Sequence, residues 1–461
     1  MIHMSGWRAV LVVLLAVAAG QARAEEAAAP AGPMNADAAV KIALKHGSDA
    51  IRSKASIQDA LGNYWGAANG VLPAVSLNAG RSGSLTQNQP ITLATIVGTQ
   101  VVTGTGLLDV ESYQRNAVVS GSWAILNPSA IAGYSSAKNE LKSAKLQDLS
   151  TRQDIGLSVR RQYYEVVKAI KLAQVSDGAL RLSRDNERRV RALFEVGSVS
   201  RSDLLKAQVQ TAQSELDSIT NHQQIVAQRI TLANLIGIPE NSMGEVDTTL
   251  AYRPMDYDEA TLIKEALANR PDLKAADASL KSAHAGLGAA RYSRLPYLVL
   301  SGSVNVKPAF DQKSDADTMP GAPHDISRQH VESDRIWSGT IALRWDFNVG
   351  TDSRIASARA NLMRAEDTRT ALNRDLEGDI RSALFTYRQA VAGSDVAQRS
   401  IESATETYKL IQQKYNVGSS TILDLIDAQV QLERAYSDLV NALAVIRVAE
   451  AQLNRLAGRG E

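Results

Sequence analysis

The sequence has no cysteine among its 461 residues. A chain without thiols forms no disulfide and no thiolate metal site, offers no cysteine nucleophile, and cannot carry a lipid on an amino-terminal cysteine. An excess of charge of either sign is also lacking, since 50 Lys and Arg residues face 49 Asp and Glu residues and the formal net charge is +1. Because no basic run with interleaved aromatics occurs either, nucleic acid is not expected as a partner.

Motifs for catalysis and cofactor binding are lacking too. The six histidines show no HExxH or other ligand spacing, and no P-loop pattern occurs. The stretch TGTG at 103–106 falls in an expected loop, not between a strand and a helix. The sequence therefore predicts a protein that is not an enzyme, with no catalytic residue, no metal site and no cofactor. Five histidines are expected to be solvated or packed side chains: His46, His222, His284, His324 and His330.

A hydrophobic run of membrane-spanning length is missing near the amino terminus. The apolar run from Val10 to Ala19 has about half of the ~20 residues that a membrane helix needs. It follows Arg8 and precedes Ala22-Arg23-Ala24, which has the small-x-small pattern of a signal cleavage site. We therefore expect a secretory signal peptide over 1–24, a linker over 25–33, and a mature protein outside the cytoplasm.

What the sequence does contain is an internal repeat. The stretch VGSVSRSDLLKAQVQ begins at Val196, and VGSSTILDLIDAQVQ begins at Val417, 221 positions later. The same spacing relates Asp203 to Asp424. Such self-similarity predicts two tandem copies of one structural unit. The copies span 34–237 and 255–458, with a connector over 238–254 and a short tail over 459–461.

Each copy is expected to contain one very long helix and a return helix. No strong breaker interrupts 128–195 or 349–416, so each stretch of ~68 residues would extend for roughly 100 Å as a helix. A Val-Gly-Ser turn follows, and then a helix of about 35 residues returns. In the second copy this helix has apolar side chains at the seven-residue spacing of a coiled coil, whereas the same positions of the first copy are more polar, so different neighbours are expected there. Shorter helices are expected over 258–269 and 272–293. The seven-residue pattern alone would also fit a soluble four-helix bundle.

Two stretches in each copy alternate between apolar and polar residues, as strands do. They cover about 72–84 and 117–127 in the first copy, and about 296–307 and 337–348 in the second. A half-buried sheet of a soluble protein would fit any one of them, but long helices provide no second layer to cover the apolar face. Strands that face lipid are therefore expected, with Trp123, Trp337 and Trp345 at the membrane interfaces.

Four strands cannot close a barrel, because the smallest single-chain barrels use about eight. An open sheet edge is very costly in lipid, so the sheet is expected to be shared in a symmetric ring of chains. The polar stretches 80–116 and 307–336 are expected to be loops outside the cell.

This combination of features resembles the TolC family of outer-membrane efflux proteins over about 34–458. The resemblance implies a fold that is mainly α with a membrane β-barrel portion, assembled as a homotrimer. Four strands from each chain would enter a shared twelve-stranded barrel, and the coiled-coil hairpins would form a periplasmic tunnel. The implied function is the exit duct of a tripartite export system in the outer membrane of a Gram-negative bacterium. The implied partners are outer-membrane lipid, a periplasmic adaptor (membrane fusion protein) and an energised inner-membrane transporter of the RND or ABC type.

The resemblance also assigns the doubled stretch to the periplasmic tip, where the tunnel closes and the adaptor docks. Gly197 and Gly418 would supply the positive φ of a tight reversal between helices. The spacings from Ser200 to Asp203 and from Thr421 to Asp424 match a capping box. The tip turns are thus expected at Val196, Gly197, Ser198, Val417, Gly418 and Ser419.

Charged residues beside these turns are candidates for a gate. Asp427 lies outside the cap, and its counterpart in the first copy is Lys206, which has the opposite charge. We expect three copies of Asp203, Asp424 and Asp427 to surround the closed tip and favour cations, while Lys206 or Arg201 forms ion pairs that hold it shut. Tyr415 matches a tyrosine that the family uses in its gate, whereas Ser420 stands where the best-known members have an arginine.

A periplasmic coiled-coil adaptor or scaffold protein is the alternative to a channel. Such a protein would be expected to carry one hairpin flanked by small β domains. Two hairpins and alternating strands with an apolar face favour the channel.

Overall fold

The computed structural model describes residues 33–97, 99–252, 254–307, 310–317, 325–331, 334–346 and 350–459. The predicted signal peptide over 1–24 lies outside these residues. The chain divides into two compact units. The first unit comprises Met1–Arg52, Thr151–Asn269 and Gly378–Glu461, and the second comprises Ser53–Ser150 and Arg270–Glu377.

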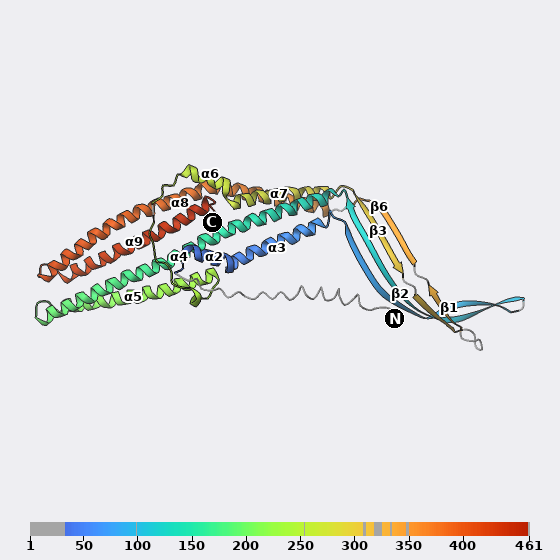
Figure 1. The fold of residues 1–461 in the computed structure, drawn as a ribbon, viewed down its shortest axis with the longest axis horizontal. Helices are drawn as coiled ribbons and strands as arrows, with labels where there is room; N and C mark the ends of the chain where they lie inside the picture. Colours follow the sequence, from blue (N-terminus) through green and yellow to red (C-terminus); the bar gives the residue numbers. More distant parts are fainter. Residues whose placement is uncertain are drawn as a thin grey trace. The chain divides into compact units, whose positions relative to one another are not determined.

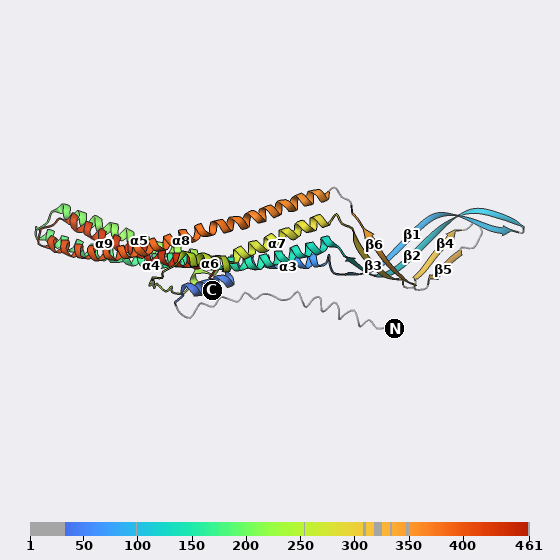
Figure 2. The same ribbon diagram turned by 90° about the horizontal axis from the view of Figure 1, so that it is seen from above.

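The first unit is built around two antiparallel helical hairpins (Figures 1 and 2). Hairpin 1 consists of α4 (Pro128–Glu195) and α5 (Arg201–Ile236), and hairpin 2 consists of α8 (Gly350–Asn416) and α9 (Ile422–Leu456). Both agree closely with the helices predicted from the sequence. The shorter helices of this unit are α2 (Ala36–His46), the 3-10 helix η1 (Glu240–Ser242) and α6 (Glu259–Asn269).

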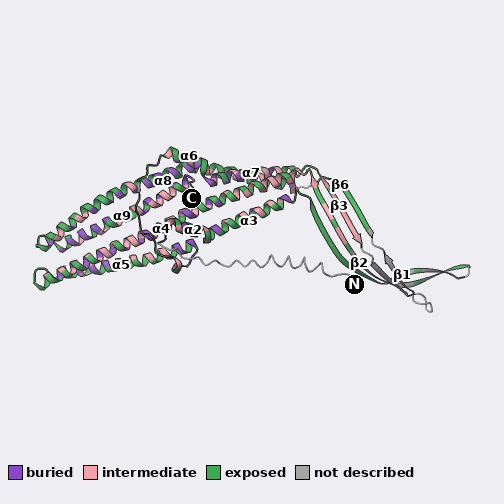
Figure 3. Cartoon of the chain, in the orientation of Figure 1, coloured by how far each residue is buried: buried purple, intermediate pink, exposed green. Residues whose placement is uncertain are grey.

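The largest core of the first unit joins α2 and α5 to α4. Met34, Val159 and Leu232 are fully buried in it, and burial alternates with exposure along the helices (Figure 3). Met34 also forms a parallel bridge with Val246, so the chain just before α2 lies beside the connector between the two copies. The hydroxyl of Tyr163 donates to the carbonyl oxygens of Met34 and Asp247 at 3.1 and 2.7 Å. Among the helices of the described residues, none combines the length and apolarity needed to cross a membrane.

The second unit contains one antiparallel sheet and the helices next to it in the chain. Most of α3 (Ser48–Ala68), all of α7 (Pro271–Tyr292) and the sheet-proximal parts of α4 and α8 belong here. One end of the sheet has the strand order β1-β2-β3-β6. The strands are β1 (Ala74–Val97), β2 (Gln100–Ile125), β3 (Tyr297–Lys307), β4 (Phe310–Asp317), β5 (Asp325–Val331) and β6 (Asp334–Arg344).

The prediction that 80–116 and 307–336 form loops was wrong for the described residues of both stretches, which form strands, while their position outside the cell stays a prediction. The strands β1 and β2 pair almost without interruption from Ala74 opposite Ser122 to Val97 opposite Gln100, and β4 pairs with the far half of β2. TGTG at 103–106 therefore lies in a strand. The physical reason is visible in ITLATIVGTQVVT, whose β-branched residues favour strands although the surrounding stretch is polar.

The strands predicted at 296–307 and 337–348 are present, although β6 begins and ends earlier than expected. Trp345 lies just beyond the end of β6, and residues 347–349 lie outside the described part of the chain. Register confirms the predicted faces, because Val119 pairs with Val304 and Val304 pairs with Trp337. One face therefore carries apolar side chains that are exposed in the single chain: Val75, Leu77, Val119, Trp123, Leu300, Trp337, Ile341 and Leu343.

The opposite face of the sheet is covered with small hydroxyl side chains. Ser76 and Ser120 are joined across β1 and β2 by a hydrogen bond of 2.7 Å, and Ser303 and Ser338 across β3 and β6 by one of 2.8 Å. A sheet with one apolar face and one polar face is the arrangement of a barrel wall between lipid and water.

Candidate functional site: the tips of the two hairpins

Each hairpin reverses through a Schellman motif centred on a glycine. In hairpin 1 the amide of Ser198 donates to Leu193 at 2.8 Å and the amide of Gly197 donates to Phe194 at 2.9 Å. In hairpin 2 the amide of Ser419 donates to the Lys414 carbonyl at 2.9 Å, and the amide of Gly418 donates to the Tyr415 carbonyl at 3.1 Å. The glycines have φ of +78° and +75°, as the sequence predicted. The valine before each glycine is exposed, 74% for Val196 and 79% for Val417.

A capping box begins each return helix. The amide of Asp203 donates to Ser200 Oγ at 3.1 Å, and the Ser200 amide donates back to Asp203 Oδ2 at 3.3 Å. In the second copy the amide of Asp424 donates to Thr421 Oγ1 at 3.2 Å, and the Thr421 amide donates back to Asp424 Oδ2 at 2.9 Å. The Asp424 carboxylate also accepts hydrogen bonds from the hydroxyls of Thr421 and Ser420. The bond from the Thr421 amide, followed by these two hydroxyl bonds, lowers the pKa of Asp424 below its ordinary value. Both predicted caps are confirmed, so these two carboxylates have a structural role.

An apolar cluster beneath the turns holds the two tips together. It combines Val190 and Ala207 of hairpin 1 with Tyr408, Ile422 and Leu425 of hairpin 2. Such a cluster fixes the two turns relative to each other, because its side chains come from all four helices.

Tyr415 belongs to the same cluster, and its hydroxyl is buried. Among the described residues this oxygen has no hydrogen-bond partner. Burial, and then the negative charge of Asp203, raise the pKa of Tyr415, while Arg189 lowers it. The structure thus brings together two of the predicted gate residues, Tyr415 and Asp203.

The remaining predicted gate residues lie on the outer faces of the return helices. Lys206 Nζ is 4.0 Å from Asp203 Oδ1 in the same helix, a separation that allows only a weak contact. Arg201 and Asp427 are exposed, and within the described part of the chain neither has an ion pair. The single chain therefore leaves Arg201 and Asp427 available to contacts with other chains.

A buried polar network between the hairpins was missed by the sequence analysis. Gln429 of α9 is only 2% exposed; its amide nitrogen donates to Ser183 Oγ at 2.6 Å, and its amide oxygen accepts from Asn186 at 2.9 Å. Ser183 and Ser214 share a hydrogen bond of 2.9 Å, which extends the network to α5. The signal available was Gln429 itself, a long polar residue directly after the apolar Ala428, which the seven-residue spacing places on the packed side of the helix.

The tryptophans predicted at the membrane interfaces lie at the sheet. The indole nitrogens of Trp123 and Trp345 donate to the carbonyls of Val71 and Arg294, at 2.9 and 3.0 Å. These bonds tie each ring to the segment that leads into β1 or β3. Trp337 lies farther along β6 and is largely exposed.

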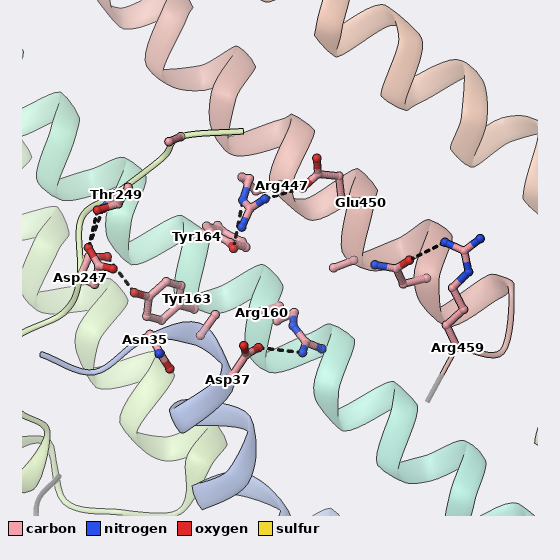
Figure 4. A pocket seen from close by; sticks show the side chains of 14 residues that line it. Asn35, Asp37, Arg160, Tyr163, Tyr164, Asp247, Thr249, Arg447, Glu450 and Arg459 are labelled. Carbon is pink, nitrogen blue, oxygen red and sulfur yellow. Dashed lines mark hydrogen bonds and ion pairs between the residues drawn. The ribbon is translucent and has the colours of Figure 1, made fainter. Parts of the chain in front are cut away.

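A cavity of about 530 Å³ lies far from the tips, between α2, α4, α9 and the connector (Figure 4). Its cations are matched by acceptors: Arg160 pairs with Asp37 at 2.9 Å, and Arg447 pairs with Glu450 at 2.7 Å. The Arg447 guanidinium also lies 5.5 Å from the centre of the Tyr164 ring. The ion pair of Arg160 with Asp37 links α4 to α2, and the contact of Arg447 with Tyr164 links α9 to α4. Among the described residues, no three histidine or carboxylate side chains are grouped to hold a metal ion.

Comparison with known proteins identifies the fold and the family. The chain is 27% identical over 372 residues to nodulation protein T of Rhizobium leguminosarum bv. trifolii, covering 77% of this chain and 70% of that protein. It is 24% identical to the outer membrane protein TolC of Vibrio cholerae over 74% of this chain and 77% of the relative. The crystal structure of the outer membrane protein VceC from Vibrio cholerae superposes with a TM-score of 0.70 at 16% identity, covering 92% of this chain and 96% of that one.

The family description "Outer membrane efflux protein" matches residues 40–238 and 262–459. These two ranges fall one on each of the tandem copies found in the sequence, and together they cover most of the chain. Efflux proteins of this kind are transport channels and not enzymes. The paired hairpins, the sheet with its apolar face and the doubled tip turn are features of one architecture, and the chain belongs to the outer membrane efflux protein family.

Proposed function

We propose that this protein is the exit duct of a tripartite export system, and that its hairpin tips form a closable periplasmic entrance. The duct itself follows from the family, and the closable tip is supported by the doubled turn with its glycine, its capping box and its apolar cluster. The single observation that carries the proposal is that both copies build the same rigid turn at the same end of the first unit. A rigid turn with an exposed valine suits docking, because its shape is already set before a partner binds.

The docking partner that we propose is a periplasmic adaptor, joined in turn to an inner-membrane transporter of the RND or ABC type. Val196 and Val417, together with Gly197, Ser198, Gly418 and Ser419, would contact the adaptor. Exposed apolar side chains flanked by small polar ones provide the centre and the rim of a protein interface. The sheet would lie in the outer membrane with Trp123, Trp337 and Trp345 toward the headgroups, and the hairpins would lie in the periplasm.

In the proposed homotrimer, three copies of Asp427 alternate around the entrance with three copies of Lys206. This follows from the repeat, because Asp427 and Lys206 occupy equivalent places on the two return helices. The carboxylates favour cations, and contacts between Asp427 and Lys206 or Arg201 of a neighbouring chain favour the closed state. Each exposed pair contributes at most about 1 kcal/mol, so closure depends on several pairs acting together.

Single-channel recording in planar bilayers tests the gate through Asp427→Asn. The wild type is expected to open rarely and to prefer cations. Loss of up to three pairs worth at most about 1 kcal/mol each would raise the ratio of open to closed states by about tenfold to a hundredfold, with a weaker preference for cations.

Asp438→Asn is the matched control, since Asp438 is an exposed aspartate farther from the turn on the same helix. It should behave as the wild type does. If Asp427→Asn and Asp438→Asn both leave opening and ion preference unchanged, the carboxylate gate is wrong. A folded protein that forms no channel in any variant contradicts the duct itself.

A further inference from the structure

Three glycines lie side by side across the sheet of the second unit. Gly121 of β2 pairs with Gly302 of β3, and Gly302 pairs with Gly339 of β6. Because side chains alternate along a strand, the residues two positions before and after each glycine lie with it on the apolar face. These flanking residues are all large: Val119, Trp123, Leu300, Val304, Trp337 and Ile341. The three glycines therefore form a trough in the apolar face, which we call the glycine trough, with a row of apolar side chains on each side.

The chain itself does not require glycine at these three places. None of the three has a positive φ, and the strand pairing runs through them without a bulge. A Cβ at Gly339 would meet no atom within 4 Å, and a Cβ at Gly121 or Gly302 would make only ordinary contacts with backbone oxygens, at 3.8 and 3.5 Å. Glycine weakens a strand, and where no bulge explains it, it marks a bend or the close approach of a ligand. The glycine trough therefore serves either a bend of the sheet or an occupant from outside the chain.

Unpaired polar groups beside the glycine trough favour an occupant. Arg335, Trp337 and Gly339 follow one another at every second position of β6, so they share the apolar face. Arg335 is exposed, and among the described residues it has no acidic partner. Trp337 is 76% exposed and its indole nitrogen donates to no described residue, whereas those of Trp123 and Trp345 donate to carbonyls of the chain. A free guanidinium and a free N–H beside an apolar trough match a molecule with an anionic head and an apolar tail.

The position of these groups along β6 selects one leaflet of the membrane. The strand ends at Arg344, shortly before α8 begins at Gly350, so Arg335 lies at the end of the sheet away from the helices. In the proposed duct the helices are periplasmic, which places Arg335 in the outer leaflet. Gly339 lies about 13 Å from Arg335 along the strand at ~3.3 Å per residue, toward the middle of the membrane. Barrel strands are tilted by about 35–45°, so the glycine trough, which runs across them, is inclined to the membrane and open to a chain from the outer leaflet.

We propose that the glycine trough binds one acyl chain of a phosphorylated glycolipid of the outer leaflet, a lipopolysaccharide. Arg335 pairs with a phosphate of the headgroup, since a guanidinium binds phosphate through two parallel hydrogen bonds. The indole nitrogen of Trp337 donates to the headgroup, while its ring borders the acyl chain. The missing side chains of the three glycines let this chain lie against the backbone. The inference rests on the proposed function, because it requires the sheet to lie in the outer membrane.

Native mass spectrometry of the delipidated, detergent-solubilised protein with added lipid A tests the site. The wild type is expected to bind one lipid A molecule per chain, and to prefer it to phosphatidylglycerol, which also has a phosphate and acyl chains. Gly339→Leu fills the glycine trough and should weaken lipid A binding by about tenfold or more. Arg335→Gln removes the partner of the phosphate, and because the site is exposed, it should weaken binding by up to about fivefold.

Two variants of the same strand are matched controls. Arg344→Gln removes an exposed arginine at the other end of β6, and Thr340→Leu adds bulk next to Gly339 but on the opposite face. Both should bind lipid A as the wild type does. Unchanged binding by Gly339→Leu and Arg335→Gln, or equal binding of phosphatidylglycerol by the wild type, would overturn the inference. If Gly339→Leu does not assemble, Gly339→Ala replaces it, and failure of the alanine variant as well would show that the glycines serve a bend and not a lipid.

The bilayer recordings separate this inference from the proposed function. Normal conductance by a protein that shows no preference for lipid A would reject the lipid site and leave the duct in place. Selective lipid A binding that depends on Gly339 and Arg335, in a protein that never conducts, would leave the lipid site in place and reject the duct.

Discussion

At the scale of single residues, Gln429 links the two hairpins through buried hydrogen bonds. Its side chain satisfies Asn186 and Ser183 and also donates to the Ala179 carbonyl at 3.2 Å. All these groups are buried or lie on a buried helix face, so they have no ready access to water. Ser183 also bonds Ser214 and Asn186 also bonds Tyr408, so what the loss of Gln429 removes is its own buried hydrogen bonds.

Replacement of Gln429 by alanine is expected to lower the free energy of unfolding by about 2 to 3 kcal/mol, because its three buried hydrogen bonds, to Asn186, Ser183 and the Ala179 carbonyl, are lost together. Gln431→Ala, an exposed residue of the same helix, should change it by less than about 0.5 kcal/mol. Urea unfolding of the detergent-solubilised protein, followed by circular dichroism, measures both. Equal midpoints for the two variants would show that the network contributes nothing.

At the scale of elements, local signals allowed prediction of the helices but only of part of the sheet. The ends of α4, α5, α8 and α9 follow from glycine, serine, threonine and aspartate within a few residues, so their bounds could be predicted closely. The pairing of β2 with both β3 and β4 depends on residues far apart in the chain, and the polar composition of 80–116 concealed the strands there. The network around Gln429 was missed for the same reason, since its partners lie in another hairpin.

The glycine of the tip turn allows a paired test of the hairpin. A Cβ at Gly418 would meet no atom within 4 Å, but its φ of +75° is unfavourable for alanine, so Gly418→Ala should destabilise hairpin 2 by about 1 to 2 kcal/mol. Gly393 lies inside α8, also with open space around it, and Gly393→Ala should stabilise the helix by up to about 1 kcal/mol. Opposite shifts of the unfolding midpoint are expected. A stabilising Gly418→Ala would contradict the role given to this backbone conformation.

At the scale of the whole molecule, the differences between the two copies are as informative as their likeness. The offset of 221 pairs Asp427 with Lys206, Arg447 with Val226 and Tyr164 with Phe385. Two copies that share a fold but differ at these places give alternating surfaces around a ring. The same offset pairs Glu433 of α9 with Ala212 of α5, so at this level only the second copy has a partly buried carboxyl.

Glu433 makes stability depend on pH in a direction that its surroundings determine. Burial, and then the negative charge of Asp217, raise the pKa of Glu433 above its ordinary value of 4.5. Between 4.5 and the raised value the folded protein binds more protons at this site than the unfolded chain does, so the contribution of Glu433 to stability falls as pH rises through that window. At pH values above the window Glu433 is ionised in both the folded and the unfolded state, and it lowers the free energy of unfolding by a constant amount.

Glu433→Gln is therefore expected to raise the unfolding temperature at neutral pH, since glutamine carries no charge to desolvate or to repel Asp217. The advantage should shrink as pH falls and vanish below 4.5, where the glutamate is protonated in both the folded and the unfolded state. Glu402→Gln, at an exposed position of α8, is the control and should change little over this range. Thermal unfolding of the assembled protein over a series of pH values measures the difference. An advantage of Glu433→Gln that persists unchanged in acid would mean that the carboxyl costs stability through its shape and not its charge.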